Sequence, residues 1–251
     1  MADVWVLVSL VIAILIHVWL PLHYFFYLKS KYNVQPVVFG LGVVSFIIAF
    51  LVKIPLIVGV RRLAGISGMS DVFIASVIVA AIAVSICENL SRYFVVKLFT
   101  AEEVRHNTAM TFGLGFGWCK SLLVGLMLLS MAIGMVSFEL GDYSQFQGTA
   151  EYGQASQTQV ALSSVDPAVP LFGSLNRIFD IVIAMCLSVF AFAALHKIKY
   201  LFYAIGLQFV FEFLILYGSQ YGAGFTAFVG MILALSSMWL MLRNKGAILR
   251  E

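Results

Sequence analysis

Seven long and nearly uninterrupted apolar stretches constrain the fold of this chain more than any other feature. A helix needs about 20 mostly apolar residues to cross the hydrocarbon layer of a bilayer. Strand crossings are not indicated, because the runs are continuous instead of alternating over about ten residues. We therefore expect an all-α, polytopic transmembrane helical bundle, with spans at residues 4–27, 36–60, 72–97, 108–137, 175–195, 201–218 and 223–242.

The composition leads to the same expectation. Hydrophobic residues make up 62% of the chain and charged residues 11%, and the mean hydropathy is +1.02. Soluble domains carry roughly a quarter charged residues, so the lipid bilayer is the expected surrounding for one transmembrane domain over residues 1–251. The net charge of +3, without a long basic run, gives no indication of nucleic acid as a partner.

The first stretch has no basic n-region and no A-x-A cleavage site, so we expect a mature span and not a cleaved signal. Orientation follows from the basic residues, which collect on the cytoplasmic side. An N-out, C-in topology places most of the basic residues on the cytoplasmic side. It leaves Arg61 and Arg62 in an outer loop, which is evidence against it. The residues assigned to the cytoplasmic side are Lys29, Lys31, Lys97, Arg105, Lys197, Lys199, Arg243, Lys245 and Arg250.

Residues 138–174 form the only long polar stretch, rich in Gln, Ser, Gly and Thr. Such a composition cannot bury enough apolar area to fold as a domain. We expect an extracytoplasmic polar loop. It would serve either as a flexible connector or as a docking loop that becomes ordered on binding a partner.

Several ionisable or strongly polar residues occur at membrane depth, where they are costly and normally face the bundle interior with a partner. They are Lys53, Glu88, Arg92, Lys120, Asp180 and Glu212, with the neutral Asn89 and Gln208. Glu88 and Arg92 are four residues apart and can pair on one helix face. One shared interior cluster is the simplest interpretation. It could be structural glue between helices, a path for protons, ions or substrate, or a hydrolytic centre.

Gly113, Gly115 and Gly117 do not match a dinucleotide-binding fingerprint. No strand precedes them, and the third glycine is not at the spacing that the fingerprint requires. In a membrane helix, small residues let a neighbouring backbone approach closely, so we predict a packing role. The four histidines include no HxxxH or HExxH pair. A catalytic zinc usually needs three protein ligands, so no metal and no cofactor is expected.

The segment from Cys87 to Tyr93 contains Glu88 and Arg92 in an order that resembles the Glu-Glu-x-x-Arg-Tyr motif of the YhfC family. These are multi-pass proteins classed as intramembrane metalloproteases and related to the CAAX-processing and bacteriocin-processing proteases. Further along, the run from Gly113 to Lys120 is similar to the family's Gly-Leu-Gly-His-Gly-x-x-Glu.

Two further segments follow in the family's order. Asn176 and Arg177, then Ala184, then Ser188 stand where the family has Glu-Arg, a histidine and a serine-containing run. The stretch 208–212 is similar to a final His-x-x-x-Asp. The four segments span roughly residues 86–213, more than half of the chain, and the resemblance implies a bacterial inner-membrane protein.

The departures from the family pattern are informative. Asn89 stands in place of the second glutamate, and Lys120 in place of the glutamate that follows the glycine motif. The family's histidine positions hold Phe116, Ala184 and Gln208. In the family, those histidines and glutamates are expected to hold a metal or to activate water. Phenylalanine and alanine have no lone pair to offer, and a lysine ammonium repels a dication, so metal-based water activation is lost.

The resemblance therefore implies a degenerate active site, with no catalytic residue, at Glu88, Asn89, Arg92, Phe116, Lys120, Ala184, Gln208 and Glu212. Our first hypothesis is a non-catalytic pseudoprotease that acts as a scaffold or accessory subunit beside another membrane protein. The alternatives are an active intramembrane protease in which Glu88 alone activates water, and a small transporter. We further expect Lys120 to replace the missing metal charge and to form an ion pair with Glu88.

Overall fold

The computed structural model describes residues 4–66, 72–99, 106–140 and 165–243. Within these residues the chain is helical and contains no strand, as predicted. Each of the seven long helices has the length and hydropathy to cross a membrane, so the chain is a multi-pass membrane protein. In chain order these helices are α1 (Val4–Tyr32), α2 (Pro36–Ile66), α3 (Val72–Phe99), α4 (His106–Leu140), α6 (Ala168–Ala193), α7 (Lys199–Gly218) and α8 (Ala223–Arg243), with a 3₁₀ turn (Ser219–Tyr221) before α8.

The helix ends follow local sequence signals. α1 runs to Tyr32, five residues past the predicted end of the first span, and its last turn carries Lys29 and Lys31. Long lysine side chains can keep their charges in water at the end of an apolar helix. Asn33 then adopts a left-handed backbone with φ 49°, a conformation in which asparagine often ends helices. Pro36 starts α2, where its missing N–H costs no helical hydrogen bond.

The predicted loop at 138–174 is too long at both ends. α4 continues to Leu140 and α6 begins at Ala168, so both flanks of the stretch are helical. Pro167 precedes the first turn of α6, and the Ala168 N–H donates to the Asp166 carboxylate over 2.8 Å. This contact satisfies one of the N–H groups that a helix start leaves open. Residues 141–164, the centre of the expected loop, lie outside the described residues.

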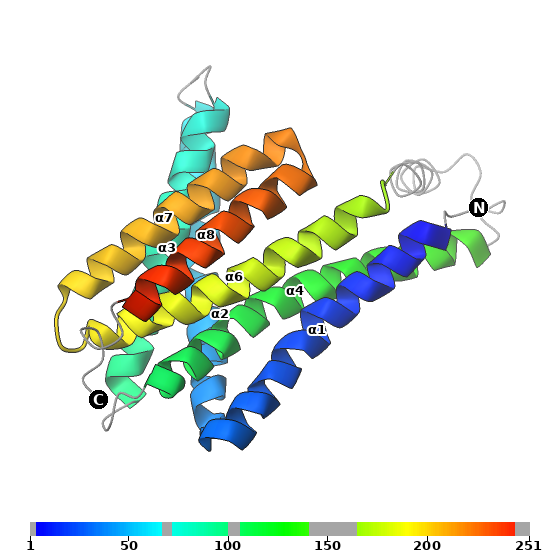
Figure 1. Ribbon diagram of the computed structural model, residues 1–251. Coiled ribbons are helices and arrows are strands. Elements are labelled where there is room, and N and C mark those ends of the chain that lie inside the picture. Colours follow the sequence, from blue (N-terminus) through cyan, green and yellow to red (C-terminus); the bar gives the residue numbers. More distant parts are fainter. Residues whose placement is uncertain (1–3, 67–71, 100–105, 141–164, 244–251) are drawn as a thin grey trace.

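α4 and α6 form the middle of the bundle. α4 packs against α1, α2 and α6, while α6 also packs against α8; α3 lies between α2 and α7. In Figure 1, α1, α4, α6 and α8 run side by side, and α2 and α3 cross behind them. α6 is buried almost continuously from Ile181 to Ala193, as expected for a helix surrounded by other helices.

The glycines of α4 permit close helix packing, which confirms the predicted role of this motif. A Cβ atom on Gly113 would lie 2.5 Å from the Cα of Met185 in α6. A Cβ on Gly115 would collide with the backbone carbonyl of Phe39 in α2. Gly113 and Gly117, four residues apart, face α6, and Gly115 between them faces α2. One short segment of α4 can therefore pack closely against both neighbouring helices.

Candidate functional site

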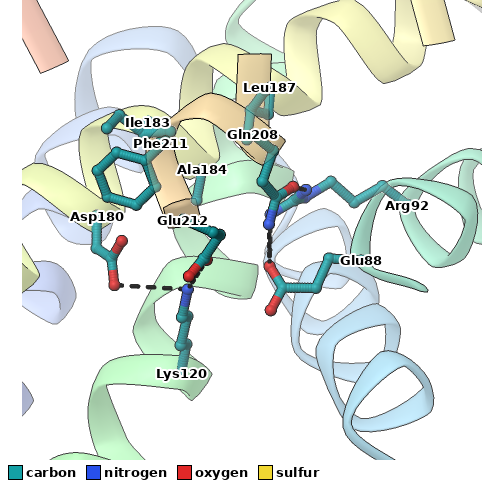
Figure 2. Close-up of a pocket in the computed structure, with 10 residues that line it drawn as sticks. All are labelled: Glu88, Arg92, Lys120, Asp180, Ile183, Ala184, Leu187, Gln208, Phe211 and Glu212. Carbon is teal, nitrogen blue, oxygen red and sulfur yellow. Dashed lines mark hydrogen bonds and ion pairs between the residues drawn. The ribbon is translucent and has the colours of Figure 1, made fainter. Parts of the chain in front are cut away.

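The eight positions singled out from the sequence meet at one place in the bundle. Six of them line a common cavity: Glu88, Arg92, Lys120, Ala184, Gln208 and Glu212. Figure 2 shows these side chains converging from α3, α4, α6 and α7. The other two, Asn89 and Phe116, contact members of this group directly. Residues up to 124 positions apart, Glu88 and Glu212, are therefore brought together, as the expected shared interior cluster requires.

Glu88 is fully buried on α3, with 0% of its surface exposed. One carboxylate oxygen accepts a 2.7 Å hydrogen bond from the ammonium of Lys53, which reaches in from α2. The other accepts a 2.7 Å hydrogen bond from the side-chain amide of Gln208 on α7. The guanidinium of Arg92 lies 3.5 Å from that same oxygen, so the predicted i,i+4 pair on α3 is confirmed. Both oxygens of Glu88 are thus engaged.

Gln208 connects α7 to α3 through both ends of its amide. Its nitrogen donates to Glu88, and its oxygen accepts hydrogen bonds from Asn89 at 2.7 Å and from Arg92 at 2.9 Å. Arg92 also donates to the Asn89 oxygen over 3.1 Å. Because a buried polar group is costly unless it is hydrogen-bonded, this arrangement lets several such groups stay inside the bundle.

Phe116 covers the guanidinium of Arg92. The ring centroid lies 3.7 Å from the Arg92 Cζ atom, in the geometry of a cation–π contact. Phe116 in turn packs edge-on against Phe46 of α2, with ring centroids 5.3 Å apart. Phe116 therefore acts as an apolar cover for a buried cation.

A second group of charges surrounds Lys120 of α4. Its ammonium lies 3.0 Å from a carboxylate oxygen of Glu212 and 3.5 Å from one of Asp180 (Figure 2). Asp180 also accepts a 2.5 Å hydrogen bond from Arg177, one turn earlier on α6. Lys120 thus links α4 to both α6 and α7.

The expected ion pair between Glu88 and Lys120 is wrong. Among the described residues, the ion pairs of Glu88 are made with Lys53 and Arg92, and those of Lys120 with Glu212 and Asp180. The two groups line the same cavity but belong to separate pairs. The charge of Glu88 is instead balanced by α2, whose lysine reaches the carboxylate across the α2–α3 contact.

Four cations and three carboxylates make up this polar network, which we define as Lys53, Glu88, Asn89, Arg92, Lys120, Arg177, Asp180, Gln208 and Glu212. Each carboxylate has at least one cation within 3.5 Å. The cavity among these side chains has a volume of about 10 Å³. That is roughly the space for one water molecule, so the network is closely packed.

The donor set does not fit a metal ion. Among the described residues, no three His, Cys, Asp or Glu side chains come close enough to hold one. The carboxylates that face the cavity, Glu88, Asp180 and Glu212, are each bound to lysine or arginine. A dication would have to displace these cations, and positive charge near a site opposes metal binding.

Three network members were seen in the sequence as polar groups but were not assigned to the site: Lys53, Arg177 and Asp180. Lys53 is the closest charged partner of Glu88, although it is 35 positions away in the chain. Its occurrence within an apolar span was the available signal, because a buried lysine needs a carboxylate. Which carboxylate it meets is decided by the packing of α2 on α3.

The positions of the polar network follow the order of the motifs that resemble the YhfC family, and comparison with known proteins agrees with this resemblance. The chain matches the model of the family described as YhfC intramembrane metalloprotease over residues 12–235, which is most of its length. No match was found among curated proteins or among solved structures. The chain belongs to the YhfC intramembrane metalloprotease family.

Proposed function

We propose that this protein is a non-catalytic member of its family, acting as a scaffold or accessory subunit of a membrane complex in a bacterial inner membrane. One observation carries the proposal. Both carboxylate oxygens of Glu88 are bound, by Lys53 and Gln208, inside a network with only about 10 Å³ of free space. A general base must reach the proton that it removes, directly or through one water, and a peptide substrate needs far more room.

The replacements at the family's ligand positions also support a structural role. Lys120, Gln208 and Phe116 each make a contact that stabilises the bundle: an ion pair to Glu212, hydrogen bonds to α3 and a ring on Arg92. Residues that had only lost a catalytic function would not need such partners. The network thus connects α2, α3, α4, α6 and α7 as a structural core would.

The main alternative is a protease in which Glu88 activates water without a metal. Lys53 and Arg92 are both paired with the carboxylate, so they occupy the group that would act as the base. Hydrolysis would require the network to open. This alternative and the scaffold hypothesis differ in one respect that can be measured, the need for the Glu88 carboxylate itself.

The test uses a charge-balanced pair of substitutions. Glu88→Gln alone leaves the Lys53 ammonium buried without a partner, so misfolding would obscure the result. Glu88→Gln combined with Lys53→Met removes both charges and leaves the net charge unchanged. In a strain that lacks the gene, we expect the double variant to restore the wild-type phenotype. It should also co-purify with the same membrane protein from native membranes in mild detergent.

A folded double variant that fails to restore the phenotype, while retaining its membrane partner, would overturn the scaffold hypothesis in favour of a Glu88-dependent protease. Thermal unfolding in detergent verifies that the variant is folded. A stable wild-type protein that co-purifies with no membrane partner would also contradict the proposal.

A further inference from the structure

An apolar cavity of about 430 Å³ lies between α1, α4, α6 and α8, apart from the polar network. This volume is within the range of small-molecule sites. Its floor is buried and comes from the middle helices, with Leu114 of α4 and Ile181 and Met185 of α6. Leu20 of α1 and Met238 of α8 stand at its edges, where 43% and 40% of their surfaces are exposed. The cavity is therefore a groove with one open side, which we call the α1–α8 groove.

The open side of the groove lies between α1 and α8. Both helices pack against α6, and within the described residues they do not pack closely against each other. Figure 1 shows α4 and α6 lying between them. All four helices are long and apolar enough to span a membrane. A hydrocarbon chain of a neighbouring lipid can therefore enter the groove sideways and stay in apolar surroundings.

The two helices beside the opening carry charge of one sign only. Neither α1 nor α8 contains an aspartate or a glutamate, and their charged residues are Lys29, Lys31 and Arg243. All three lie in the last turn of their helix, a few residues beyond the part that lines the groove. One end of the groove is thus flanked by cations, without an acidic group on either helix to neutralise them.

A chain of contacts connects one of these cations to the groove. Tyr24 lines the groove and stacks on Tyr27, with ring centroids 5.9 Å apart. The ammonium of Lys31 donates a 2.9 Å hydrogen bond to the Tyr27 hydroxyl. Lys31 is exposed and lies seven residues beyond Tyr24, about 10 Å along the helix axis. An ammonium has three N–H donors, so the remaining ones can reach oxygens of a ligand.

We infer that the α1–α8 groove binds an anionic phospholipid of the surrounding bilayer, such as phosphatidylglycerol. One acyl chain lies in the groove against Leu114, Ile181 and Met185, and the second chain stays in the bilayer. The phosphate at the end of the groove accepts hydrogen bonds from Lys31. Met110 and Met241 also line the groove, and flexible thioether side chains adapt to irregular ligands. This inference goes beyond the scaffold proposal and does not rest on it.

The charge at the end of the groove selects the class of lipid. Basic residues at the membrane surface attract anionic headgroups, and α1 and α8 offer no carboxylate that would bind a cationic one. A phosphatidylcholine has an acyl chain of the same kind but no net charge, so it gains only the apolar contacts. Preference for the anionic headgroup is therefore the property to measure.

The experiment is photo-crosslinking of the full-length protein in phosphatidylcholine nanodiscs. A small fraction of the lipid is phosphatidylglycerol with a diazirine near the end of one acyl chain. Intact-mass spectrometry measures the labelled fraction, and peptide mapping locates the label. We expect this probe to label the groove residues about fivefold more efficiently than a phosphatidylcholine that carries the same diazirine chain.

Met238→Trp tests the groove itself, because it places a larger side chain at the open edge. Most of the groove labelling should be lost. Met231→Trp is the matched control. Met231 is the same residue type seven positions earlier on α8, its surface is 37% exposed, and it does not line the groove. Groove labelling of this control should equal that of the wild type.

Lys31→Gln tests the headgroup contact. It should reduce labelling by phosphatidylglycerol about fivefold and leave labelling by phosphatidylcholine unchanged, while Lys31→Arg should keep most of the preference. Lys29→Gln is the matched control, since Lys29 has the same charge in the same turn but lies on another face of α1 than Tyr24. Its labelling should stay close to that of the wild type.

Equal groove labelling by the two lipids would overturn the inference, in favour of a groove that accepts any acyl chain. Unchanged labelling of Met238→Trp would also overturn it. So would an equal loss at Lys29→Gln and Lys31→Gln, which would mean a diffuse attraction to the basic end of the bundle. None of these results depends on whether the Glu88 network is catalytic.

Discussion

Glu88 and His17 are buried to nearly the same extent, yet their surroundings differ completely. Glu88 has partners on two neighbouring helices and on its own, in a space of about 10 Å³. Among the described residues, the Nε2 atom of the buried His17 has no partner. Buried polar atoms almost always have a partner, so the network around Glu88 is the usual arrangement and His17 is the exception. The position that the family resemblance emphasised is thus the more structural of the two.

The largest expected effect concerns the ion pair between Lys53 and Glu88. Glu88→Gln should lower the free energy of unfolding by about 3–5 kcal/mol, because it leaves a buried cation uncompensated. Adding Lys53→Met should recover part of that loss. Unfolding in detergent, measured for both single variants and the double variant, gives the coupling between the two positions.

The control is the same set of single and double variants at Glu88 and Lys120, because these two side chains pair with different partners. We expect a much smaller coupling there. Stronger coupling of Glu88 to Lys120 than to Lys53 would contradict the arrangement of the network.

A second effect concerns the close packing that encloses the network. A Cβ atom on Gly42 would collide with the Phe112 carbonyl and lie 2.8 Å from the Phe116 nitrogen. Gly42→Ala should therefore lower stability by about 1–3 kcal/mol. Gly40→Ala, two residues earlier on the same helix, meets nothing within 4 Å and should be neutral or slightly stabilising. Equal melting temperatures for the two variants would be inconsistent with the tight α2–α4 contact.

A smaller effect is expected at Phe116, whose ring lies over Arg92. Phe116→Leu keeps an apolar side chain but removes the cation–π contact, which should cost about 1–2 kcal/mol. Phe202→Leu, at a residue whose surface is 67% exposed, should have little effect in the same unfolding assay. A loss at Phe202 as large as that at Phe116 would show that aromatic area, and not the Arg92 contact, determines stability.

The smallest effect is expected at His17. His17→Leu removes an unpaired polar atom and adds apolar surface, so stability should change by less than about 1 kcal/mol. Thermal unfolding after extensive detergent washing checks this. A loss as large as that of Glu88→Gln would mean that His17 has a structural partner, and the contrast between the two regions would no longer hold.

The helices could be predicted from the sequence with different accuracy. The seven spans followed from apolar runs. They were placed within about five residues of the helix ends, except that α2 runs to Ile66 and that the first turns of α6 were assigned to the polar loop. That error arose because residues 165–174 have mixed composition, while Pro167 and Asp166 mark a helix start. The N-out orientation stays a prediction, since the helices have the same geometry in either direction.

The sequence alone determined that polar groups such as Glu88, Lys53 and Gln208 would be buried and would need partners, because the bilayer core offers them none. It also determined that the glycines of α4 would allow close packing. Only the tertiary structure decided that Lys53 and not Lys120 pairs with Glu88, and that Nε2 of His17 has no partner among the described residues. Pairing across helices depends on how those helices are rotated and packed against each other, and the order of residues along one helix does not contain that information.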